Sequence, residues 1–310
     1  MNKSEYEKLC LEANKKKLRL TKKLQREIKD IYKQMYLNTS KKLSKVSNDS
    51  LSERYVRSVL KSLQEDISAF SNSIDKRLSK DLIDIANLAN ETQLNLLVNA
   101  DRSFKLGLGD NFIDMFAKVP QAAVNEIIAG KLYKDRLGLS ERIWACTKKF
   151  EKDINYVLTE GIAAKKPIHE IAKDLEVYLN PNAKKSWAWR NVYPKASIQV
   201  DYNTQRLART AINHTFQQAQ KRSCQRNPFV TGIKWLTSGS HRTCELCMSR
   251  NGVVYSVNNL PLDHPNGKCT TIPVLEKELD QIGEELRNWI DGESNTKLDK
   301  WFKEYGKDFL

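Results

Sequence analysis

Three cysteines and one histidine in the last third of the chain have the spacing of metal ligands. Cys244 and Cys247 are separated by two residues, and His264 and Cys269 follow after sixteen more residues, with four residues between them. Thiolate and imidazole groups are ligands that Zn²⁺ takes, and four of them close a tetrahedral site that leaves no position for water. The spacing therefore predicts a structural Zn²⁺ site formed by Cys244, Cys247, His264 and Cys269.

One other interpretation of this cluster stays open. Residues 264–267 read His-Pro-Asn-Gly, which is also a turn sequence, and the thiols would then be reduced and without a metal. A thioredoxin-like redox pair is disfavoured because no βαβ pattern surrounds the Cys-x-x-Cys segment. In a domain of about 75 residues the core is small, so a bound metal would contribute much of the stability.

A catalytic alternative comes from the same segment. Asp263-His264 followed by Gly267 resembles the start of an HNH-type nuclease site, in which histidine is a general base and a divalent ion stabilises the leaving oxygen. The chain lacks the Asn-Leu segment and the second Cys-x-x-Cys-His pair of such sites, and residues 270–274 have the composition of a strand. We therefore expect no enzymatic activity, with an HNH-like metal-dependent nuclease as the alternative.

The beginning of the chain is strongly basic. The net charge is +14. The first 80 residues hold 20 Lys+Arg and 10 Asp+Glu, so they carry +10 of this charge. Such a surface favours polyanions such as nucleic acid, although a solvated lysine-rich helix face is the simpler explanation. The residues expected to contact DNA phosphates or an acidic protein partner are Lys15, Lys16, Lys17, Arg19, Lys22, Lys23 and Arg26.

Nothing in the sequence indicates a membrane or secreted protein. No run of about 18 apolar residues is present, and the first ten residues are charged and lack an apolar segment. We therefore expect no membrane partner. The six cysteines of such a chain indicate metal binding before disulfides, and Cys10, Cys146 and Cys224 are expected to be inert thiols.

Helical periodicity dominates residues 1–224. Residues 3–37 carry one apolar stripe that includes Leu20 and Leu24, and residues 38–50 read as a polar link. A second helix begins at a Ser-x-x-Glu capping box at residue 50 and runs to about residue 85, long enough that a kink near residues 71–73 is an alternative. Further helices are predicted over 110–129, where Asp110 is the expected cap, and over 140–159, 167–179 and 198–224. Residues 182–197 read as an aromatic-anchored connection.

Strand signals appear only after Pro228. Residues 232–236, 253–256 and 271–274 are rich in β-branched and aromatic residues, and residues 276–306 return to a helical pattern. The predicted fold is mainly α with a small α+β C-terminal domain. The expected division is a helical region 1–197, a Cys/His-stapled domain 198–275 and a C-terminal helix 276–310.

A series of short motifs resembles the phage head morphogenesis family, the MuF-like minor head proteins of tailed bacteriophages. The resemblance is specific over residues 195–275 and is carried, in order, by Arg209, Thr210, Trp235, Arg242, Thr243, Cys244, Cys247, Gly252, Tyr255, His264, Pro265, Asn266 and Cys269. Many members have a Cys-Arg-Cys segment where this chain has Gly267-Lys268-Cys269, so one sulfur ligand of that pattern is absent.

The resemblance implies a function that composition and spacing do not give. Such proteins are low-copy inner components of the virion head, where they are associated with the portal, the scaffold and the major capsid protein during assembly in the host bacterial cytoplasm. Some are thought to contact packaged double-stranded DNA. A DNA-binding protein without a capsid role is a further alternative.

Overall fold

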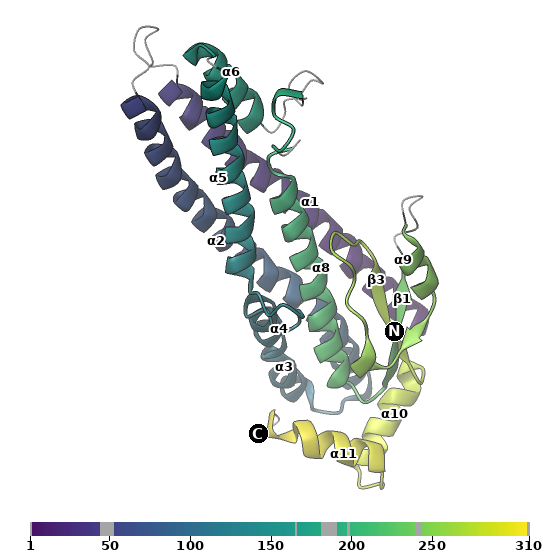
Figure 1. The fold of residues 1–310 in the computed structure, drawn as a ribbon. Coiled ribbons are helices and arrows are strands. Elements are labelled where there is room, and N and C mark those ends of the chain that lie inside the picture. The colour runs from purple at the N-terminus through teal and green to yellow at the C-terminus, as the bar shows by residue number, and fades with distance from the viewer. Residues whose placement is uncertain are drawn as a thin grey trace. The chain divides into compact units, whose positions relative to one another are not determined.

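The structure is a computed structural model, and helices make up most of it (Figure 1). A small three-stranded antiparallel sheet lies in the C-terminal part of the chain. The predicted fold class, mainly α with a small α+β region, is therefore confirmed. The described residues are 2–43, 53–164, 166–180, 191–196, 199–237, 239 and 243–308.

The chain forms two compact units, and neither is a single continuous stretch. The first, called the cluster unit below, contains residues Met1–Thr21, Lys80–Arg136 and Arg209–Leu310. The second, called the helical unit, contains Lys22–Ser79 and Leu137–Ala208. Three long helices contribute residues to both units, so the units do not follow the consecutive segments 1–197, 198–275 and 276–310.

The first two helices are longer than their patterns predict. Helix α1 spans Lys3–Leu43 and continues into the predicted polar link. Helix α2 spans Glu53–Phe104, and residues 71–73 lie within it. The Ser73 hydroxyl donates a hydrogen bond to the Ala69 carbonyl, which satisfies the serine inside the helix. The capping box predicted at residue 50 begins outside the described residues.

The helix predicted over 110–129 is two helices. Helix α3 spans Gly109–Ala117 and α4 spans Val119–Ile128, with Lys118 between them and a proline in the first turn of α4. Because proline has no N–H, it fits the first turn of a new helix but not the middle of a long one. The prediction that Asp110 caps this helix is wrong, since Leu108 is the N-cap residue and Asp110 lies in the first turn.

The helical unit has an aromatic centre. Helix α5 spans Leu139–Ala163 and α6 spans Ile168–Leu179. The ring of Tyr32 on α1 packs edge-on against Phe70 and Phe150, with centroids 4.6 and 5.5 Å apart. Helix α5 continues four residues past its predicted end at about residue 159, and the missing side chain of Gly161 lets α6 approach closely. A Cβ there would lie 2.8 Å from Ile171.

The cluster unit contains the sheet. Strand β1, Val230–Leu236, lies between β2, Val254–Tyr255, and β3, Thr270–Leu275, and both pairings are antiparallel. Helix α9, Glu245–Arg250, and the short turn η1, Val257–Asn259, flank β2 along the chain. The three predicted strands are confirmed. The sheet places the loop before α9 and the loop before β3 at neighbouring strand ends, because Leu236 pairs with Thr270.

Two helices rather than one end the chain. Helix α10 spans Leu279–Ile290 and α11 spans Thr296–Tyr305, followed by η2, Gly306–Asp308. The turn between α10 and α11 contains Gly292 at φ +103°, and Asn295 caps α11 by accepting hydrogen bonds from two backbone N–H groups. Both helices pack on the main core of the cluster unit. That core includes Tyr6, Leu96, Phe112, Phe116, Phe229, Leu275, Ile282, Leu286, Leu298 and Trp301.

Candidate metal centre

The first two cysteines are positioned by α9. Cys244 is the residue before the helix and Cys247 lies in its first turn, so both thiols face the same side. The backbone on either side is held to β1: Trp235 donates its N–H to the Val253 carbonyl, and its own carbonyl accepts from Gly252. Gly252 has φ +80°, the left-handed region that favours glycine. Gly252, one of the residues of the sequence resemblance, therefore forms the turn that brings the chain back to the sheet after the Cys-x-x-Cys segment.

The candidate ligand His264 lies at the start of a tight turn. The Gly267 N–H donates to the His264 carbonyl at 2.9 Å, with Pro265 and Asn266 at the two central positions. Asn266 has φ +67°, which matches a type II turn with proline first and asparagine second. Residues 264–267 thus form a turn, and this turn places His264 Nε2 3.4 Å from Cys244 Sγ.

Five potential ligand atoms converge on one place. The side chains of Cys244, Cys247 and His264 form one group, and those of Cys247, Asp263 and Cys269 form another, with all ligand atoms of a group within 4.8 Å of one another. All three cysteines are free thiols. Cys244, Cys247, His264 and Cys269 lie close enough together to bind a metal ion, as their spacing in the sequence predicts.

The orientation of His264 also fits a ligand. Its Nδ1 lies 3.0 Å from the Pro265 carbonyl oxygen, which accepts a hydrogen bond when Nδ1 carries the proton. That tautomer leaves the lone pair of Nε2 directed at the cysteines. Metal-binding histidines usually donate their second ring N–H to a carbonyl or carboxylate in this way.

The thiols differ in how readily they ionise. A hydrogen bond from the Cys247 backbone lowers the pKa of Cys244, and the neighbouring His264 acts in the same direction. Burial raises the pKa of Cys247 well above its ordinary value. A buried thiolate needs a nearby cation, and a divalent metal ion supplies one. The donor set therefore fits a thiolate-binding metal.

Asp263 is a residue of this centre that the ligand spacing does not reveal. Its side chain is fully buried, and its carboxylate accepts hydrogen bonds from Asn213 Nδ2 at 2.7 Å and from the backbone N–H of Cys269 at 3.1 Å. It also accepts from the N–H of His264 at 2.9 Å. The carboxylate thus holds together the two ends of the loop that carries His264 and Cys269.

Helix α8, Tyr202–Gln225, presents a buried polar face to this loop. His214 Nε2 lies 2.8 Å from the Asp263 carbonyl oxygen, and Gln217 accepts the Asp263 N–H. Gln220 donates to the Thr271 carbonyl on β3. These residues follow each other at three-residue spacing, which places them along one side of a helix, and this signal was available in the sequence.

The motif residues of the sequence resemblance surround the same centre. Arg209 donates a hydrogen bond to the Asn266 side chain, and Thr210 Oγ1 accepts the Asn266 N–H at 2.8 Å. Trp235 is fully buried and packs on Cys247 and Cys269. Thr243 is half-buried directly before Cys244, while Arg242 lies outside the described residues.

The predicted basic surface of α1 needs one correction. Lys15, Lys16, Arg19, Lys22, Lys23 and Arg26 are exposed, as the sequence predicts. Lys17 is only 2% exposed and is not part of that surface. The buried stripe of α1 runs through Ala13, Lys17 and Thr21, at four-residue spacing, whereas Leu20 is only half-buried.

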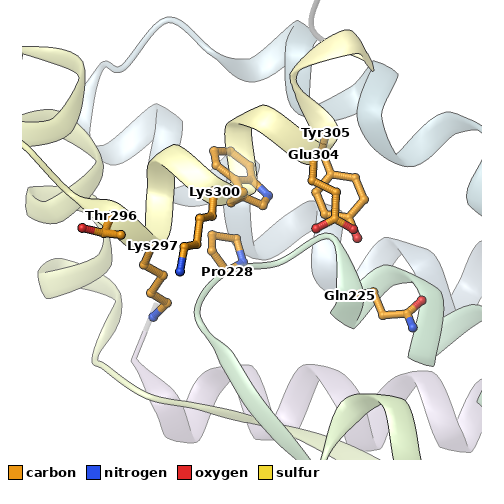
Figure 2. A pocket seen from close by; sticks show the side chains of 8 residues that line it. Gln225, Pro228, Thr296, Lys297, Lys300, Glu304 and Tyr305 are labelled. Atoms are coloured by element: carbon orange, nitrogen blue, oxygen red, sulfur yellow. The ribbon is translucent and has the colours of Figure 1, made fainter.

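The cluster unit also has an open groove, which none of the predicted site residues line. Figure 2 shows side chains of α11 facing the chain around Pro228 and the end of α8. The lining residues of the groove are Gln225, Pro228, Thr296, Lys297, Lys300, Trp301, Glu304 and Tyr305.

Within the part of the chain that the structure describes, no helix is long and apolar enough to cross a membrane.

Comparison of the chain with protein-family models, with curated proteins and with solved structures gives no match.

Proposed function

We propose that this chain is a minor head protein of a tailed bacteriophage or prophage and acts without catalysis in head assembly. Its partners would be the portal, scaffold and major capsid proteins, with packaged double-stranded DNA as a further contact. It would be found inside the procapsid or virion head, and in the host cytoplasm during assembly. In this proposal the Cys/His cluster holds one Zn²⁺ that stabilises the cluster unit.

One observation carries the proposal. Several residues on which the sequence resemblance rests are spread over more than fifty positions, yet they contact each other around one centre. Arg209 and Thr210 bind Asn266, and Trp235 packs on two of the cysteines. Residues of a motif that specifies one folded unit are expected to fit together in this way. The convergence therefore supports the resemblance and the function that it implies.

The ligand types favour zinc in a structural role. Three thiolates and one imidazole suit Zn²⁺, and four protein ligands leave no position for a substrate or water. Cys244, Cys247, His264 and Cys269 would hold the ion, which would link α9 to the loop before β3. Asp263 would act as the carboxylate that orients this loop, since three hydrogen-bond donors already occupy it.

The nuclease alternative requires His264 as a general base. Its Nδ1 faces the Pro265 carbonyl and its Nε2 faces the Cys244 thiol, so both ring nitrogens have partners within the cluster. A general base must instead reach the proton that it abstracts. We expect no cleavage of plasmid DNA with Mg²⁺ or Mn²⁺. Cleavage that disappears in His264→Ala but survives in Cys244→Ser would support the nuclease.

The test of the proposal is the location of the protein during infection or prophage induction. Procapsids and mature heads are purified from the producing cells, and the protein is quantified by mass spectrometry together with the portal protein. We expect it in procapsids at low copy number. Its presence in the soluble lysate with absence from both kinds of particle would contradict the proposal and favour a DNA-binding protein without a capsid role.

A further inference from the structure

A buried lysine connects the N-terminal helix to the candidate metal centre. Lys17 of α1 is 2% exposed and belongs to the cluster unit. Its ammonium group donates to Asn213 Oδ1 at 2.8 Å and to the Cys269 carbonyl oxygen at 3.3 Å. It also lies 4.8 Å from the centre of the Phe216 ring. Lysine is almost never fully buried unless it is paired with an opposite charge.

The hydrogen-bond partners of Lys17 are neutral, so its compensating charge must come from beyond them. Asn213 connects the two charges, because its Oδ1 accepts from Lys17 while its Nδ2 donates to Asp263 at 2.7 Å. The second nearby source is the side chain of Cys269, the residue whose backbone carbonyl accepts a hydrogen bond from Lys17. Burial lowers the pKa of Lys17 to about 8, and the Asp263 carboxylate and the Cys269 side chain oppose that fall.

The charge of a loaded centre explains why a lysine belongs there. Metal-bound cysteines are thiolates. Three thiolates and the Asp263 carboxylate carry four negative charges and Zn²⁺ carries two positive ones, so two negative charges remain in a largely buried place. Outer groups that orient ligands and balance charge commonly change metal affinity by about 10- to 100-fold. Lys17 is the cation that the described structure places against this cluster from inside the unit.

We propose that Lys17 is a positioning residue of the metal centre: its charge stabilises the loaded cluster, and metal binding in turn holds α1 against the cluster around Lys17. The inference rests on the zinc site of the proposed function. The coupling is reciprocal, because a group that strengthens metal binding must itself be held more firmly when the metal is present. Tyr6 and Cys10 hold the beginning of α1 in the main core, so the effect is expected around residues 13–21.

The experiment compares Lys17→Met with Lys16→Met in the full chain. Both changes remove one positive charge from α1, but Lys16 is exposed. Zinc affinity is measured by competition with a chelator. Hydrogen exchange of residues 13–21 is followed with and without zinc. We expect Lys17→Met to weaken zinc binding by about tenfold or more. We expect zinc to slow exchange over 13–21 in the wild type and in Lys16→Met, and to have no such effect in Lys17→Met.

Thermal unfolding without zinc separates this role from a purely structural one. Methionine replaces the ammonium with an apolar group of similar length, but it leaves the buried Asp263 charge uncompensated and Asn213 Oδ1 without its donor, so some loss of stability is expected even without zinc. The loss should be larger with zinc present, because the loaded cluster carries more negative charge than the metal-free one. Equal zinc affinity in Lys17→Met and wild type, or an equal loss of stability with and without zinc, would overturn the inference alone. A wild-type protein that binds no zinc would overturn the site and the inference together.

Discussion

Gly267 lies in the loop that carries His264 and Cys269, at a position where a side chain has no room. A Cβ atom at this position would overlap the carboxylate of Asp263. The backbone of Gly267 is not in the left-handed region, so the restriction is one of space and not of conformation. Asp263 cannot move away without losing its hydrogen bonds to Asn213 and Cys269. The glycine is therefore required for the carboxylate to reach the centre of the loop.

Gly267→Ala should destabilise the cluster unit by about 1–3 kcal/mol, the usual cost of adding a methyl group to a tightly packed site. The change in the free energy of unfolding can be measured in urea. Lys268→Ala is the matched control. The Lys268 side chain is exposed, so its loss should change the free energy of unfolding by less than about 0.5 kcal/mol. Equal stability of the two variants would show that the carboxylate has room to move.

The four candidate ligands could be predicted from the sequence, but the residues that support them could not. Cys-x-x-Cys spacing and the His-Pro-Asn-Gly turn indicate a metal site because few other structures need those residues in that order. Asp263 is a single carboxylate in a loop, and its burial depends on α8, which is distant in sequence. Lys17 was assigned to the basic surface because a lysine in a helix usually faces water. Its burial depends on contacts with residues more than 190 positions away.

Among the secondary-structure elements, α10 and α11 are joined by a polar contact that should depend on pH. Glu285 on α10 accepts hydrogen bonds from Lys277 at 2.6 Å and from Asn295, the cap of α11, at 2.7 Å. Burial alone would raise the pKa of Glu285, but these hydrogen bonds outweigh it and hold the pKa below 4.5. The ionised form therefore stabilises the helix pair.

Glu285→Gln should destabilise the protein by about 1 kcal/mol at neutral pH. A carboxyl group with a lowered folded pKa contributes stability above its unfolded value of 4.5 and loses it as the pH falls through the folded value. The stability difference between wild type and variant should therefore shrink in that acidic range. Glu284→Gln, at an exposed neighbouring position, should show no such change. A difference that stays constant into acid would contradict the assignment.

The exposed basic residues of α1 should bind DNA weakly and without sequence preference. Replacing Lys16, Lys22 and Lys23 with glutamine should weaken binding to duplex DNA at low salt. The slope of log affinity against log salt should fall by up to about 3, since each phosphate contact contributes about 0.9. Lys118, Lys131 and Lys134, which are also exposed, give a control variant of equal charge. Equal effects of the two triple changes would mean that α1 is not the DNA contact.

The predicted elements were largely confirmed, and the exceptions have local causes. Helix α1 continues past residue 37 although its sequence there is polar. The helix predicted over 110–129 divides at Lys118, where Pro120 fits a new first turn. Helix α5 continues past residue 159 to Ala163, and Gly161 within it packs closely against Ile171. Glycine, proline and polar residues indicate the local conformational preference of a segment. Packing against the rest of the protein determines whether a helix ends there.

For the whole molecule, loss of one metal ligand should affect the two units differently. Cys244→Ser should lose zinc and raise hydrogen exchange over residues 230–275, because a structural zinc ion contributes about 10 kcal/mol or more to the fold that holds it. Exchange in the helical unit, residues 22–79 and 137–208, should stay as in wild type. Cys146→Ser is the control, as its thiol lies in the helical unit. Full zinc retention in Cys244→Ser would remove that residue from the ligand set.

The central claim is that the cluster holds one closed, structural zinc ion. X-ray absorption at the zinc edge, on protein purified without chelator, reports the atoms bound to the metal. The predicted result is one zinc per chain with three sulfur neighbours at about 2.3 Å and one nitrogen at about 2.0 Å. A chain without metal would contradict the claim. So would a spectrum with oxygen in place of sulfur, which would indicate an open site that admits water or the Asp263 carboxylate.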